Sequence, residues 1–189
     1  MLAAAVELFA SRGFDATSIR DIATAARVQP ASVYYHYPSK EALLVAIVDR
    51  AAAQVADQIK AAAQSDDPWH RLEQACVAHL TALLQGERAL RVLATEIPSR
   101  RTGAVHQALV RTRDAYEDMF RDLVAALPVG PAVDRSYLRL TLLGAINWTL
   151  IWYHPGGDAP ATIARQIVTL IRQGAEGKPD APDARPVSG

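Results

Sequence analysis

The sequence predicts an all-α protein with an N-terminal three-helix, helix-turn-helix domain followed by a larger helical domain. Two observations lead to this fold class. Apolar residues recur at three- and four-residue steps over long segments, as in residues 39–64. Two short helical segments joined by a tight turn occupy residues 17–37, which is the spacing of a helix-turn-helix. We expect domain limits of 1–48 and 49–175, and a disordered tail at 176–189 that lacks apolar periodicity.

The N-terminal elements are predicted from their capping residues. Residues 1–12 form a helix that ends at Gly13, and Thr17 is expected to be the N-cap of a second helix that ends near Ala26. A turn at residues 27–29 follows. Pro30 suits the first position of the third helix, because a helix leaves that N–H unpaired in any case.

The rest of the chain divides into longer helical segments separated by proline, glycine and polar residues. Pro38 ends the third helix, and Ser39 caps the next one. The predicted helices cover residues 39–64, 69–85, 87–97, 104–127, 140–153 and 161–173.

The third helix carries side chains suited to DNA. Val33 and Tyr37 are four residues apart and can face a core, which leaves Ser32, Tyr34, Tyr35 and His36 to point outward. Hydroxyl and imidazole groups are donors to phosphate. The alternative is a plain helical hairpin whose tyrosines pack inward.

The stretches TSIRDIATAARV and SVYYHYPSKEALL resemble the DNA-binding domain of the TetR (tetracycline-repressor) family, and the match extends from about Ala4 to Ala46. The resemblance implies an all-helical homodimer that binds double-stranded operator DNA and whose variable C-terminal domain senses a small molecule. It implies that Thr17, Tyr34, Tyr35, His36 and Lys40 contact phosphates and that residues 29–32 face base edges. The full set of expected DNA-binding residues is Thr17, Ser18, Arg27, Gln29, Pro30, Ala31, Ser32, Tyr34, Tyr35, His36 and Lys40.

The motif departs from the family pattern at three points. Arg27 stands where the family usually has glycine, which is favoured when φ is positive; the arginine either gains a phosphate contact or is simply solvated. Pro30 and Ala31 cannot make bidentate base contacts, but they can contact a thymine methyl group. The chain begins inside the expected first helix, so its start is misassigned or trimmed, or a basic arm is absent.

Residues 140–153 carry no charge and are apolar on nearly all sides, so both sides of this helix should be covered. The segment is shorter than the roughly 20 residues of a membrane span, so we expect one side to pack against a partner chain and no membrane association. This helix and the last one resemble the dimerising pair of the family. The expected dimerisation residues are Gly144, Trp152, Ile163, Ile167, Leu170 and Ile171.

Isolated polar groups on the apolar helices predict a ligand pocket between segments 69–85, 104–127 and 140–153. The expected ligand-binding residues are His79, Leu83, Tyr116, Met119, Asn147, Trp148 and Ile151. The run NWTLIWYHPGG resembles family members that respond to lipid-like or acyl-CoA ligands. The alternative is ordinary core packing with local hydrogen bonds.

Enzymatic and metal-binding interpretations have little support. Cys76 and His79 could form half of a metal site, but no second ligand pair accompanies them, so a core pair is favoured. There is no glycine-rich phosphate loop and no nucleophile motif, and we expect no cofactor and no enzymatic activity.

The net charge and the cysteine content limit which functions and which compartment suit the chain. The formal net charge is zero, with 20 basic and 20 acidic residues, so DNA affinity must come from placed donors and dimerisation. One cysteine and no signal peptide suit the cytoplasm. The sequence therefore predicts a homodimeric repressor that an apolar or acyl-type molecule releases from its operator. The alternative is a dimeric sensor or interaction protein without sequence-specific DNA binding.

Overall fold

The computed structural model describes residues 1–86 and 103–177, and all regular structure in these ranges is helical. The predicted helix at 87–97 and most of the predicted disordered tail lie outside these residues. The helices are α1 (Leu2–Arg12), α2 (Ile19–Ala25), α3 (Pro30–His36), α4 (Lys40–Ala62), α5 (Pro68–Gln85), α7 (Ala104–Ala125), α8 (Arg135–Trp152) and α9 (Pro160–Glu176).

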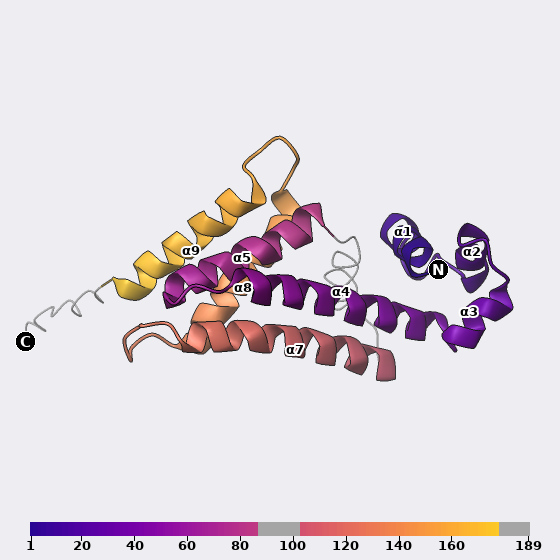
Figure 1. Cartoon of the computed structure of the whole chain (residues 1–189), viewed down its shortest axis with the longest axis horizontal. Helices are drawn as coiled ribbons and strands as arrows, with labels where there is room; N and C mark the ends of the chain where they lie inside the picture. Colours follow the sequence, from indigo (N-terminus) through magenta and orange to yellow (C-terminus); the bar gives the residue numbers. More distant parts are fainter. Residues whose placement is uncertain (87–102, 178–189) are drawn as a thin grey trace, which may run out of the picture.

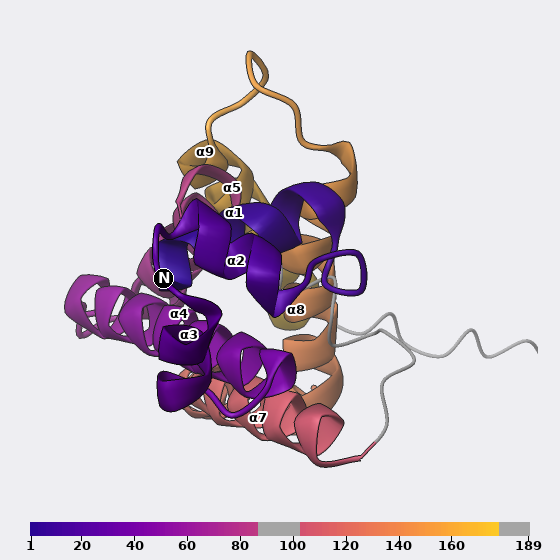
Figure 2. The ribbon, with the colours of Figure 1, turned by 90° about the vertical axis from the view of Figure 1, so that its right-hand side faces the viewer.

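Helix α4 joins the two parts of the molecule. The short helices α1, α2 and α3 gather at its N-terminal end, while α7 runs alongside most of its length (Figure 1). Farther along, α5 packs against α4 and α9, and α8 packs against α7 and α9. Figure 2 views the molecule from the end where α1–α3 lie. The expected domain boundary at residue 48 falls inside α4. The same unbroken helix therefore belongs to both the helix-turn-helix domain and the helical domain that follows.

The second helix is capped by a residue other than the predicted one. Ser18, not Thr17, is the N-cap of α2: its side chain accepts the Asp21 N–H at 3.1 Å, and the Asp21 carboxylate accepts the Ser18 N–H at 2.9 Å. This reciprocal pair is a capping box. The Thr17 hydroxyl instead donates to the Gly13 carbonyl at 2.8 Å, and the residue is only 1% exposed.

Helix α8 begins earlier than predicted. Asp134 accepts the N–H groups of Ser136 and Tyr137, so α8 starts at Arg135 rather than at residue 140. The charged Arg139, which directly precedes the apolar segment predicted at residues 140–153, lies inside the helix. No helix of the described ranges combines the length and the hydropathy that crossing a bilayer requires.

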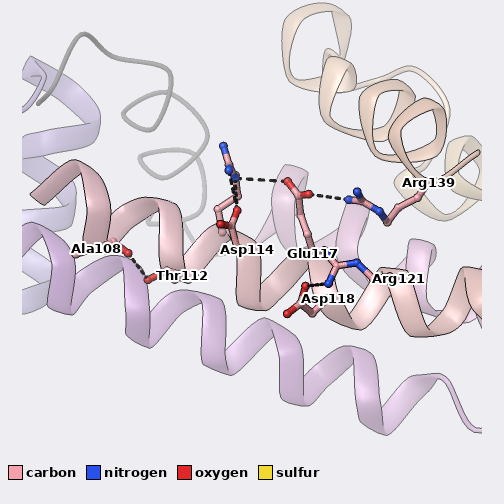
Figure 3. Close-up of polar contacts among 8 residues, drawn as sticks. Ala108, Thr112, Asp114, Glu117, Asp118, Arg121 and Arg139 are labelled. Atoms are coloured by element: carbon pink, nitrogen blue, oxygen red, sulfur yellow. Dashed lines mark hydrogen bonds and ion pairs between the residues drawn. The ribbon is translucent and has the colours of Figure 1, made fainter. Parts of the chain in front are cut away.

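An ion-pair network joins α7 to α8 (Figure 3). Arg139 of α8 donates to the Glu117 carboxylate of α7 at 2.7 Å, and Arg113 lies 3.6 Å from the other oxygen of Glu117. The Arg139 side chain is mostly buried, so this pair is less screened than an exposed one. The network holds α8 against α7, with one face of α8 left outward.

Candidate DNA interface and buried polar cluster

Helix α3 presents its aromatic side chains to solvent, as predicted. Val33 is fully buried and attaches the helix to the core, whereas Tyr34 is exposed and Tyr35 is 85% exposed. The Tyr35 ring meets His36 edge-on, with centroids 5.1 Å apart. The alternative of a hairpin with inward-packed tyrosines is therefore wrong for Tyr34 and Tyr35, while Tyr37 does pack against the core.

The first turn of α3 is also accessible. Gln29 is the N-cap, Pro30 is the first helical residue and Val33 is the buried anchor. Gln29, Ala31 and Ser32 are exposed, and Pro30 is half-buried. The four residues expected to face base edges therefore lie together at the first turn of one short helix, and Ser18 at the start of α2 is also exposed.

Two of the residues expected to contact phosphate are engaged inside the protein instead. Thr17 is buried, and its hydroxyl is bonded to Gly13. The Lys40 ammonium donates to the carbonyls of Phe14 at 2.8 Å and Thr17 at 2.7 Å and lies 4.3 Å from the centre of the Phe14 ring. In the unbound protein this ammonium ties the loop before α2 to the start of α4, because the loop carbonyls need partners where the chain turns inward. The DNA contacts expected of Thr17 and Lys40 stay predictions.

Arg27 has a φ of 56°, and it is the positive-φ residue other than glycine in the described part of the chain. This confirms that the turn between α2 and α3 needs the conformation glycine favours. Its side chain is exposed, which leaves the guanidinium available to a phosphate.

We expect Arg27→Gly to raise the free energy of unfolding by about 0.5–1 kcal/mol, because a β-carbon is disfavoured in the left-handed region. Urea unfolding of both proteins measures this change. Arg27→Ala is the control, since alanine removes the charge and keeps the β-carbon. A stabilisation by alanine equal to that by glycine would assign the effect to charge instead of backbone strain.

A polar cluster lies where α5, α7 and α8 meet. Nδ1 of His79 lies 2.5 Å from the Tyr116 hydroxyl, and Nε2 lies 3.2 Å from the Asn147 side-chain oxygen. Since the Asn147 oxygen only accepts, Nε2 carries the proton, and Nδ1 accepts from the Tyr116 O–H. Phe120 packs against both rings, with its centroid 5.6 Å from His79 and 5.9 Å from Tyr116.

Burial keeps this cluster neutral. His79 is 6% exposed, and its pKa is lowered from 6.5 to about 4 mainly by burial, against a smaller opposite effect of the Asn147 hydrogen bond. Burial likewise raises the pKa of Tyr116. The arrangement is a hydrogen-bonded chain through an apolar core, with Asn147 at its exposed end on α8.

The other residues expected to bind the ligand do not line one pocket together with this cluster. Leu83 is buried in the core. Met119 lines a separate shallow cleft with Ile59 and Arg71. Trp148, 63% exposed, and Ile151 lie on the outward face of α8, so their expected position inside the pocket is wrong for the single chain. The sequence interpretation treated α8 as buried on all sides, which made its two faces indistinguishable.

The expected dimerisation residues divide between two faces. Trp152 and Leu170, the latter 66% exposed, are outward, and Gly144 has open space where a β-carbon would stand. Ile167 and Ile171 are partly buried against the core. Ile163 was expected at the dimer interface, and this is wrong for the single chain. It is buried within its own chain, because α9 turns that side toward α5. Tyr137 and Leu140 are also exposed on α8, and Tyr137 lies outside the helix predicted at residues 140–153.

Cys76 belongs to the core. It is fully buried, and burial raises its pKa, so the thiol stays protonated. No group of three His, Cys, Asp or Glu side chains able to hold a metal ion occurs within residues 1–86 and 103–177. The core interpretation of the Cys76 and His79 pair is the one that these contacts support.

Known proteins match both halves of the chain. The family model described as "Bacterial regulatory proteins, tetR family" matches residues 1–47, and that described as "Tetracyclin repressor-like, C-terminal domain" matches residues 65–175. The HTH-type transcriptional repressor KstR2 of Rhodococcus jostii is 25% identical over 181 residues, covering 92% of this chain and 88% of KstR2.

Solved structures share the fold. A tetR-family regulatory protein from Rhodococcus RHA1 is 27% identical, with a TM-score of 0.77, over 92% of this chain and 94% of that one. AibR, solved in complex with isovaleryl coenzyme A and operator DNA, is 23% identical with a TM-score of 0.77 over 89% of this chain and 94% of AibR; at that identity the likeness concerns the fold alone. With family models matching both the helix-turn-helix and the helical domain that follows it, the chain belongs to the TetR family of bacterial transcriptional regulators.

Proposed function

We propose that this protein is a homodimeric repressor that a small apolar or acyl-type molecule releases from operator DNA. The observation that carries the proposal is the exposed α3, whose polar aromatic side chains extend from a helix anchored by the buried Val33. Two tyrosines are exposed on a seven-residue helix, and phosphate contact gives their hydroxyls a hydrogen-bond acceptor. Regulators named as repressors among the relatives support the direction of control.

In this proposal each α3 enters a major groove. Gln29, Pro30, Ala31 and Ser32 face base edges, while Ser18, Arg27, Tyr34, Tyr35 and His36 meet the backbone. The two half-sites of a dimer then lie about 34–36 Å apart, or a multiple of this distance. Thr17 and Lys40 hold the loop before α2 in place through their bonds to backbone carbonyls. The domain limits follow as 1–48 for DNA binding and 49–175 for ligand binding and dimerisation.

The regulatory part of the proposal uses the His79–Tyr116–Asn147 cluster as the polar element that senses the ligand. A buried polar chain in an apolar core is costly unless all its bonds are made. A ligand that disturbs one bond therefore changes the packing of α5, α7 and α8 together. Release from DNA requires that the ligand prefer a conformation in which the two α3 helices no longer match the operator. By reciprocity, the operator must weaken ligand binding by the same factor.

The test is operator binding by Tyr35 variants. Operator sites are first selected from a random DNA pool by the wild-type protein. Tyr35→Ala is expected to weaken binding by about tenfold or more, because a hydrogen bond to a charged phosphate is worth about 1.5–3 kcal/mol. All sequences should weaken together, and the salt dependence should flatten slightly. Fluorescence anisotropy at fixed salt measures both.

Two controls define the result. Tyr35→Phe keeps the ring and removes the hydroxyl, so it separates stacking from phosphate contact. Gln54→Ala changes an exposed residue of α4 away from α3 and should bind like wild type. Unchanged affinity of Tyr35→Ala would remove this tyrosine from the interface. Failure of the wild-type protein to select any site would favour the alternative, a dimeric sensor without sequence-specific DNA binding.

A further inference from the structure

A cleft opens between α4 and α7, away from the core of the helical domain. Its volume is ≈ 440 Å³, within the range of small-molecule sites. The two helices run side by side in the same direction (Figure 1). Their facing side chains are mostly alanines, which are too short to fill the space: Ala52, Ala53 and Ala56 on α4, and Ala108 and Ala115 on α7.

The ends of this cleft carry its distinguishing groups. At the end near the helix-turn-helix, Val45 adds apolar surface and the Thr112 hydroxyl donates to the Asp49 carboxylate across the two helices. Arg111 lines the same cleft with an exposed guanidinium, the group that binds carboxylates with paired hydrogen bonds. Farther along, the Tyr116 ring lines the cleft while its hydroxyl bonds to His79.

We propose that this cleft binds the effector, and that the effector is a carboxylate with a medium-length hydrocarbon chain. The chain lies on the alanine walls and Val45, and the carboxylate meets Arg111. The assignment rests on the proposed function and specifies the ligand class and place of binding. The ligand then lies in the cleft between α4 and α7 and contacts the His79–Tyr116–Asn147 cluster only through the Tyr116 ring, which lines the cleft.

The position of the cleft explains how such a ligand would act on DNA binding. Val45 lies little more than one turn into α4, whose first residue Lys40 is bonded to the loop before α2. A ligand that binds more tightly when α4 and α7 stand farther apart would displace α4 where it carries the helix-turn-helix. Ligand binding also affects the domain core through Tyr116, because moving its ring disturbs the hydrogen bond to His79.

The test uses decanoate as the probe and isothermal titration calorimetry of the full-length protein. Ala56→Phe fills the cleft and is expected to weaken decanoate binding at least tenfold. Ala61→Phe is the matched control, since Ala61 is an exposed alanine of α4 that does not line the cleft, and should bind as wild type does. Arg111→Gln should weaken decanoate about tenfold and leave binding of 1-decanol unchanged.

The possible outcomes distinguish failure of the cleft assignment from failure of the repressor proposal. Circular dichroism and operator binding of each variant check that the fold and the DNA interface are intact. If wild-type protein binds its selected operator but does not bind decanoate, or if Ala56→Phe binds decanoate as wild type does, the cleft assignment is overturned and the repressor proposal stands. If no operator can be selected, the repressor proposal fails, while calorimetry still decides whether the cleft takes the carboxylate.

Discussion

Trp148→Glu and Leu170→Glu are each expected to convert a dimer into 20.4 kDa monomers and to lower operator affinity at least 100-fold. Trp148 of α8 and Leu170 of α9 are large apolar side chains exposed on helices that pack together. Exposed apolar surface of this kind marks an interaction site. A carboxylate buried there without a partner costs several kcal/mol, and a monomer contacts only one half-site.

Size-exclusion chromatography with light scattering gives the mass, and anisotropy gives the affinity. Gln54→Glu adds the same charge to an exposed position of α4 and should leave both unchanged. Ile163→Glu is a contrasting variant: because Ile163 is buried within its own chain, it should lower the free energy of unfolding rather than separate folded monomers. A folded dimer formed by both Trp148→Glu and Leu170→Glu would show that these helices do not form the interface.

Local sequence signals predicted the N-terminal helices well, because capping and turn residues act over short distances. Pro30 begins α3 and Ser39 caps α4 as expected, and the positive φ of Arg27 follows from its position in the turn. The role of Lys40 was missed because it depends on contacts across the fold. Thr17 was mistaken for the N-cap because the adjacent Ser18 is an equally good capping residue, and Ser18 forms the reciprocal bonds with Asp21. Lys40 reaches Phe14, 26 residues away in the sequence, and no local pattern encodes that distance.

The C-terminal half was predicted less completely, since the two faces of an apolar helix cannot be told apart by periodicity. Trp148 and Asn147 are neighbours in the sequence, yet Asn147 reaches back to His79 while Trp148 points outward. The convergence of His79, Tyr116 and Asn147 was anticipated from the rarity of polar groups on these helices. The cleft between α4 and α7 was not, because alanine suits both a close helix contact and an open space.

His79 is expected to make the protein acid-labile in a defined pH window. Its pKa is 6.5 when the chain is unfolded and about 4 in the fold, where burial disfavours the charged ring. Above pH 6.5 both states hold a neutral imidazole, and this residue adds no pH dependence. As the pH falls from 6.5 to 4, the unfolded state takes up the proton and the folded state does not, so folding stability decreases.

The decrease is about 3 kcal/mol per chain over that window, at about 1.4 kcal/mol for each unit by which the pKa is lowered. Urea unfolding at a fixed protein concentration between pH 7 and pH 4 measures it, since a dimer's stability depends on concentration. His79→Gln removes the titrating group and keeps the capacity to hydrogen-bond, so its stability should fall less steeply than wild type below pH 6.5. His154→Gln makes the same substitution at an exposed histidine and is the matched control. Parallel pH profiles for wild type and His79→Gln would mean that the pKa of His79 is the same in the folded and the unfolded chain, and that burial does not keep its ring neutral as described.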